Sequence, residues 1–96
     1  VIDAERFLRD PGSQLRGLCQ RLGLEFSERM LSWPAGPRAS DGIWAPYWYD
    51  VVWKSTGFES WRPRDVQLDG QAALVADACR PVYERLHGQR LIVTGI

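Results

Sequence analysis

A chain of 96 residues is long enough for one small domain at most. Its apolar content of 45% and charged content of 25% are ordinary for a folded globular protein and exclude a disordered or fibrous one. Twelve basic residues balance twelve acidic ones, and neither sign forms a run, so binding to nucleic acid or to an anionic membrane is not expected.

The first elements expected along the chain are a short strand and an amphipathic helix. Val1 and Ile2 are β-branched and apolar, as in the end of a buried strand. Asp10-Pro11 predicts a helix start, because aspartate accepts a hydrogen bond from a free amide of the first turn and proline suits the first helical position. Gly23 is placed to end this helix. Apolar residues recur at helical spacing between these ends, at Leu15, Leu18, Cys19 and Leu22.

In the middle of the chain the sequence predicts two helices with a loop between them. Ser27 can cap a short helix, which Trp33-Pro34 ends. Residues 34–42 are rich in proline, glycine and polar residues and therefore favour an exposed loop held by turn chemistry. Pro46 can open the second helix, which is expected to run through about Ser55.

The last third of the chain is expected to form irregular chain and then a long helix. Residues 58–69 mix aromatic residues, arginine and proline without a period. An apolar stripe predicts a helix over about 71–86, and Pro81 inside it removes one backbone hydrogen bond, so the helix should kink or split there. Residues 91–93 are apolar and fit either a short strand or a docking tail.

The segment from Trp44 to Trp61 is unusually rich in aromatic residues. It holds seven of the eleven aromatic residues in the chain. Such side chains bury much area with few rotatable bonds, so they can form the wall of a site for a planar ligand or bind a partner protein. Most of these rings are expected to serve packing, with Trp44 and Tyr47, beside the loop, as the exceptions.

Just before this segment, Gly36-Pro37-Arg38 and Asp41-Gly42 combine flexible backbone with one guanidinium group. Arginine presents a planar fork of donors that matches phosphate or sulfate, and glycine lets backbone amides approach such a ligand. The alternative is a solvated arginine in a proline-rich turn. Residues 54–57 contain Lys-Ser-Thr-Gly but lack the order of a phosphate-binding loop.

The sequence contains no recognisable catalytic or metal-binding constellation. His87 is the single histidine and has no partner at a spacing typical of a triad or a metal site. Cys19 and Cys79 lie in predicted helices, where a thiol behaves as a small apolar side chain, and this usage fits a reducing cytoplasm. No stretch is long and apolar enough to cross a membrane, and the first residues do not form a signal peptide.

The residues also resemble a known family. The first quarter of the chain is similar to a stretch typical of sulfotransferases, in which a strand is followed by an acidic pair, an Asp-Pro step and a helix. The resemblance continues towards Leu86 and there is closest to the sulfotransferase-like proteins of bacteria, with a similar region in plant proteins labelled branched-chain-aminotransferase-like. The segments that carry this second part are 30–38, 41–46, 48–49 and 55–58.

The resemblance implies a P-loop-type three-layer α/β fold, of which residues 1–96 are the mainly helical carboxyl-terminal part, without the amino-terminal phosphate-loop half. It implies transfer of a sulfuryl group from the donor 3′-phosphoadenosine 5′-phosphosulfate (PAPS) to an acceptor, with no metal. This segment is expected to contribute binding and no catalytic residue. The residues expected at the donor are Gly36, Arg38, Asp41, Gly42 and Trp44. Those expected at the acceptor are Tyr47, Trp48 and Trp53.

Two other functions are open at this stage. An exposed aromatic patch also suits a non-catalytic interaction module that docks another domain or subunit. An aminotransferase activity is suggested by the plant label alone, and nothing here resembles the lysine site of pyridoxal phosphate. In every case the chain is expected to be cytoplasmic and to need a further half or partner domain.

Overall fold

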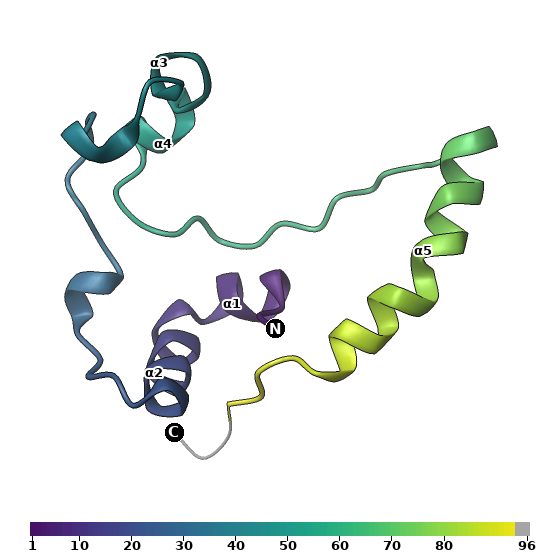
Figure 1. The fold of residues 1–96 in the computed structure, drawn as a ribbon, viewed down its shortest axis with the longest axis horizontal. Helices are drawn as coiled ribbons and strands as arrows, with labels where there is room; N and C mark the ends of the chain where they lie inside the picture. Colours follow the sequence, from purple (N-terminus) through teal and green to yellow (C-terminus); the bar gives the residue numbers. More distant parts are fainter. Residues whose placement is uncertain (94–96) are drawn as a thin grey trace.

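The structure, a computed structural model, describes residues 1–93 and is mainly helical (Figure 1). The described residues contain no strand, and an isolated antiparallel bridge joins Ser32 to Gly57. Irregular chain connects the helices. The helices are α1 (Ala4–Arg9), α2 (Pro11–Leu22), α3 (Ala45–Trp48), α4 (Asp50–Lys54) and α5 (Gly70–Gly88), with short 3₁₀ helices η1 (Glu28–Met30) and η2 (Ala39–Asp41).

The short strand expected at Val1 and Ile2 is not formed. The Val1 carbonyl accepts one hydrogen bond, from the Leu91 amide at 2.8 Å. A strand needs a ladder of such bonds to a neighbour, and residues 1–93 provide no such neighbour. Both side chains are consequently exposed, Val1 at 57% and Ile2 at 41%.

Helix α2 begins and ends where the sequence predicts. An Asp10 carboxylate oxygen accepts a hydrogen bond from the Ser13 amide at 3.2 Å, and Pro11 occupies the first helical position. Gly23 ends the helix in the left-handed region, at φ 69°. These end signals depend on residues a few positions apart, which is why they can be recognised without the tertiary structure.

Other predicted helices differ in detail. The helix expected from Pro46 is divided into α3 and α4 at Tyr49, whose amide donates to Ala45 and whose carbonyl accepts from Trp53. The short helix capped by Ser27 is a 3₁₀ turn. Helix α5 runs through Pro81 without splitting.

The chain is open and exposes much of its apolar surface. Its Cα radius of gyration is 16.9 Å, whereas a compact domain of this length has about 12.5 Å. Its accessible surface is 8251 Å², whereas a closed protein of this mass exposes about 5,600 Å². Helix α5 has no buried residue among those described, so its apolar stripe faces solvent.

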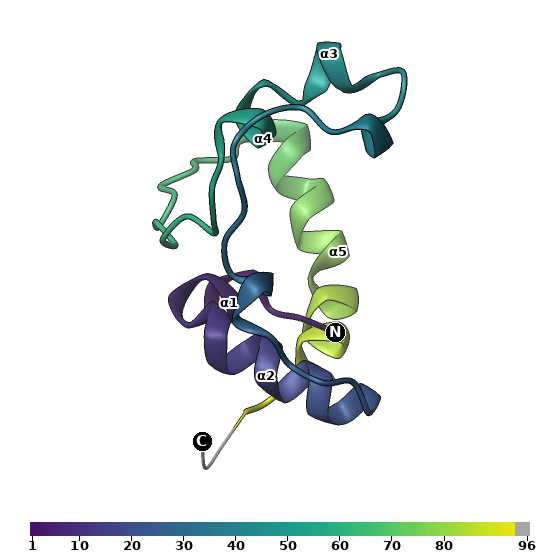
Figure 2. The same cartoon turned by 90° about the vertical axis from the view of Figure 1, so that its left-hand side faces the viewer.

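Figures 1 and 2 show how the helices are arranged. Helices α3 and α4 lie at the opposite end of the molecule from α1 and α2 in both views. In both views helix α5 runs from the level of α3 and α4 towards the level of α1 and α2. A long irregular segment connects α4 to the first residue of α5. The described residues contain no helix long and apolar enough for a membrane crossing.

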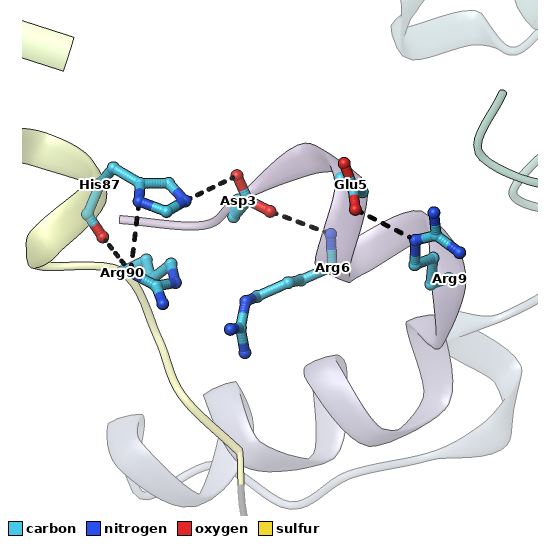
Figure 3. A network of polar contacts seen from close by, with 6 residues as sticks. All are labelled: Asp3, Glu5, Arg6, Arg9, His87 and Arg90. Carbon is cyan, nitrogen blue, oxygen red and sulfur yellow. Dashed lines mark hydrogen bonds and ion pairs between the residues drawn. The ribbon is translucent and has the colours of Figure 1, made fainter. Parts of the chain in front are cut away.

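A network of polar contacts joins the carboxyl-terminal end of α5 to the start of the chain (Figure 3). Asp3 accepts a hydrogen bond from the Arg6 amide at 3.0 Å, which caps α1, and its other oxygen lies 3.7 Å from His87 Nε2. Arg90 donates to the His87 carbonyl at 2.8 Å. The contact between Asp3 and His87 and the hydrogen bond between Leu91 and Val1 attach the end of α5 to the start of the chain, beside α1.

The residues that follow this network form a docking tail, one of the two alternatives expected for 91–93. Leu91 is buried, with 8% of its surface exposed, and Val93 packs on the face of α2 that contains Gly17. A β-carbon at Gly17 would lie 2.6 Å from Val93 Cγ2 and 3.2 Å from its Cγ1. Val93 can therefore pack closely on this face of α2 because Gly17 has no side chain.

Replacing Gly17 with alanine is expected to destabilise the protein although it favours the helix. Overpacking against the stiff β-branched Val93 costs about 1–3 kcal/mol, whereas alanine gains at most about 1 kcal/mol over glycine in a helix. Chemical denaturation measures the net loss. In a Val93→Ala background the same substitution is expected to stabilise, and a gain in stability with Val93 present would contradict docking of the tail at Gly17.

Candidate functional site

Residues 34–44 form a loop that is closed onto α4 by hydrogen bonds. The Gly36 amide donates to the Trp53 carbonyl at 2.7 Å. One carboxylate oxygen of Asp41 accepts from the Arg38 amide at 2.7 Å and from the Trp53 indole at 2.8 Å. The structure therefore brings Gly36, Arg38, Asp41 and Trp53, four of the predicted site residues, into one connected unit.

The Arg38 side chain is used in part by the loop itself. One terminal nitrogen donates to the Pro34 carbonyl at 2.8 Å and the other to the Gly36 carbonyl at 3.3 Å. A guanidinium group has five N–H donors, so Arg38 keeps donors for an additional acceptor. The arginine thus braces the loop, and its contact with a phosphate stays a prediction.

Two glycines give the loop its path. Gly36 has φ 120° and Gly42 has φ 88°, values that side chains with a β-carbon rarely adopt. No atom lies within 4 Å of the position that a β-carbon would take at either residue. The backbone conformation, rather than crowding, therefore calls for glycine at both places.

The hydrogen bonds to Asp41 also change its acidity. The Arg38 amide and then the Trp53 indole hold the pKa of the Asp41 carboxyl below its ordinary value of 3.8, because both groups donate to the ionised form. The carboxylate is consequently charged, and the loop closed, throughout the neutral range.

A second connection lies directly beside the loop, and the sequence analysis did not predict it. The Trp33 amide donates to the Thr56 carbonyl at 3.0 Å, next to the bridge between Ser32 and Gly57. The Trp33 indole donates to the Ser55 hydroxyl, also at 3.0 Å. Residues 54–57, which do not form a phosphate-binding loop, thus pair with the chain that leads into residues 34–44. In the sequence, the local feature that marks residues 54–57 as the end of a helix and the start of a connection is the Ser-Thr-Gly run.

The predicted acceptor residues, together with the predicted donor residue Trp44, are divided between two environments. Trp44 and Tyr47 are 68% and 76% exposed, and their rings lie 5.9 Å apart at an angle of 56°. Trp48 is 75% exposed and forms no ring pair within residues 1–93. Trp53 is half-buried and bonded to Asp41. Trp44 and Tyr47 are therefore neighbouring rings that are both open to a planar ligand.

The arrangement offers groups that suit ligand binding. It presents one arginine, backbone amides and flat rings. In the described part of the chain, no group of three or more histidine, cysteine, aspartate or glutamate residues could hold a metal ion.

Comparison with known families assigns the chain to a class of proteins. The model of the sulfotransferase domain family matches residues 1–89. The chain belongs to this family. The resemblance noted in the sequence is thereby confirmed.

Two curated relatives of the chain come from Arabidopsis thaliana. Branched-chain-amino-acid aminotransferase-like protein 1 is 55% identical over 60 residues, which are 62% of this chain and 11% of the relative. Branched-chain-amino-acid aminotransferase-like protein 2 is 41% identical over 86 residues, which are 90% of this chain and 15% of the relative. The chain thus spans a small part of the length of each. No solved structure matches it.

Proposed function

We propose that this chain supplies part of the ligand-binding surface of a sulfotransferase-like protein, where it helps to hold a nucleotide donor of the PAPS type and an acceptor. Membership of the sulfotransferase domain family is the observation that carries this proposal. The family resemblance implies a phosphosulfate-binding loop in an amino-terminal half, and under this proposal the catalytic groups belong to that half. We place the whole protein in the cytoplasm.

The geometry of the closed loop supports a choice of residues for this role. Arg38 would donate its remaining N–H groups to a phosphate of the donor, while the positive-φ glycines Gly36 and Gly42 leave the backbone accessible beside it. Trp44 and Tyr47 would lie against a planar group of the nucleotide or acceptor, since their exposed rings are neighbours.

Replacing Arg38 with alanine is expected to weaken binding of adenosine 3′,5′-bisphosphate by about tenfold or more, since a hydrogen bond to a charged group is lost. Calorimetry on the protein at its full natural length measures the affinity. Arg38→Lys keeps the charge and should lose most of the same affinity, because the planar fork is gone.

Arg29→Ala is the matched control, since Arg29 is an exposed arginine outside the loop. The Trp53 indole resonance reports whether the loop stays closed in each variant, because this indole is bonded to Asp41. Unchanged affinity in Arg38→Ala would remove this arginine from the donor site.

The exposed surface favours a second candidate, a non-catalytic interaction module. Trp44, Tyr47, Trp48 and Val51 are each at least 68% exposed, and they are clustered in α3, α4 and the residue before α3. An apolar surface of this kind suits docking of another domain or subunit. Under this alternative, Trp44→Ala combined with Trp48→Ala would weaken that association and leave nucleotide binding unchanged.

A further inference from the structure

Helix α5 carries a continuous apolar seam that is exposed along its whole length. The seam consists of five residues spaced alternately three and four positions apart: Ala72, Val75, Cys79, Val82 and Leu86. All five are exposed, with Val75 at 53%, Val82 at 54% and Leu86 at 48%. Alternate steps of three and four are the spacing at which two helices pack side by side. The seam therefore has the pattern of a helix-pairing surface over about four turns.

The seam is not the side by which α5 contacts the rest of the chain. The half-buried residues of α5 are Ala73, Ala76 and His87. At about 100° per residue, these three residues point about 100° away from the seam. Figure 1 shows α5 along one edge of the molecule, with the other helices on one side of it. Residues 1–93 thus leave the seam uncovered.

The charged residues of α5 lie away from the seam. Asp77 and Arg80 form an ion pair with each other at 3.2 Å, so neither leaves an unpaired charge beside it. Glu84 lies on the same side of the helix as Asp77. Arg85 borders the seam, and in an antiparallel pair of these helices it falls near Gln71 of the other copy. Two seams can therefore meet without burying an unpaired charge.

The sizes of the seam residues suit an antiparallel pair of identical helices. Cys79 is the middle residue of the five, so a two-fold axis beside it superimposes the seam on its copy. Leu86 of each copy then meets Ala72 of the other, and Val75 meets Val82. The largest side chain of the seam thus packs against the smallest, as close packing requires.

The surface of the chain is large enough for such an interface. Its accessible surface of 8251 Å² exceeds that of a closed protein of this mass by about 2,600 Å². A stable dimer buries about 800 Å² on each partner. The excess can therefore supply an interface at the seam in addition to the exposed residues of α3 and α4.

We propose that α5 is a dimerisation helix, which pairs in antiparallel orientation with α5 of a second copy of this chain, with the two Cys79 residues beside the two-fold axis. The driving force is burial of the seam on both copies. The loop at 34–44 and the rings of Trp44 and Tyr47 take no part in this contact. The inference goes beyond the proposed function and does not rest on donor binding.

The test compares two adjacent residues of α5 in the full-length protein. Sedimentation equilibrium is expected to show a dimer, and Val75→Glu is expected to raise its dissociation constant by about tenfold or more, since each seam then buries a carboxylate. Leu74→Glu is the matched control. Leu74 is more exposed than Val75, at 65%, but points about 100° away from it, so the dissociation constant should stay the same.

A cross-linking experiment tests the contact in the natural sequence and does not depend on how the glutamate variants fold. A short bis-maleimide, which adds one thiol at each end, is expected to join two copies through Cys79. Cys79→Ser should remove this product. Cys19→Ser should keep it, because Cys19 is buried in α2 with 5% of its surface exposed.

The orientation of the two helices has its own test. A Cys79→Ser, Ala72→Cys variant is mixed with a Cys79→Ser, Leu86→Cys variant. The antiparallel pair is expected to give a cross-link between the two variants. Cross-links only within each variant would show a parallel pair and overturn the proposed orientation.

Two further results would overturn the inference. One is equal dissociation constants for Val75→Glu and Leu74→Glu, which would place the dimer contact elsewhere. The other is a protein that stays monomeric up to its solubility limit; protection of Cys79 from a maleimide in that monomer would show that another part of the same chain covers the seam. Circular dichroism checks that the variants keep their helices. Failure of Arg38→Ala to weaken binding of adenosine 3′,5′-bisphosphate concerns the proposed donor site and leaves this inference unaffected.

Discussion

Replacing Phe58 with alanine is expected to lower the free energy of unfolding by about 2–3 kcal/mol, because two aromatic pairs and their buried area are lost together. The Phe58 ring meets Phe7 edge-on at 4.8 Å and Trp33 edge-on at 5.2 Å. It thereby joins α1, the chain before the loop and the segment that leads to α5. Urea denaturation followed by circular dichroism measures the change.

Trp48→Ala is the matched control for this experiment. Trp48 is 75% exposed, whereas Phe58 is 38% exposed, so removing the larger ring should cost about 0.5 kcal/mol or less. In a double-mutant cycle, Phe7→Leu and Phe58→Ala should be less costly together than the sum of the single effects, because they share one contact. Equal losses in Phe58→Ala and Trp48→Ala would contradict the joining role of Phe58.

Acidification is expected to open the loop at 34–44 in the natural protein. An Asp41→Asn variant has no carboxyl to protonate at this position, so its loop is expected to be the same at acidic and at neutral pH. The hydrogen bonds from Arg38 and Trp53 lower the pKa of the Asp41 carboxyl, so its contribution to stability is complete above 3.8. That contribution is lost as the pH falls through the lower value of the folded state. The pH dependence of the Trp53 indole resonance measures the opening.

At neutral pH, Asp41→Ala should release the loop outright, since the indole and the Arg38 amide lose their shared acceptor. Hydrogen exchange at the Arg38 amide is then expected to accelerate by about tenfold or more. Asp50→Ala is the control, because Asp50 pairs with Lys54 on the exposed side of α4. An indole resonance that titrates identically in the natural protein and in Asp41→Asn would show that another group controls the loop.

The elements that could be predicted from the sequence are those fixed by neighbouring residues. The start of α2 at Asp10 and its end at Gly23 depend on a side chain or a backbone conformation within the same turn. The expected strand at Val1 and Ile2 was wrong for the described chain, since strand formation depends on a distant partner. The division of the expected helix at Tyr49 was also missed, and no breaking residue marks it in the sequence.

The candidate site shows the same limit. Gly36, Arg38 and Asp41 are close in sequence, and their shared loop follows from turn chemistry. Trp53 was predicted as an acceptor contact, which stays a prediction, and the sequence did not show that its indole bonds to Asp41 across the loop. The pairing of Trp33 with Ser55 could not be predicted, because hydrogen bonds between distant segments leave no period in the sequence.

The contact of Phe58 with Phe7 and Trp33 also has a kinetic consequence. Helices α1 and α2 are consecutive and can associate early, whereas this cluster requires the chain to close over two long loops. The cluster should therefore form after the main barrier to folding. Its removal is expected to accelerate unfolding and to leave the folding rate nearly unchanged. The lifetime of the closed chain, more than its rate of assembly, is thus set by one phenylalanine in a segment without regular structure.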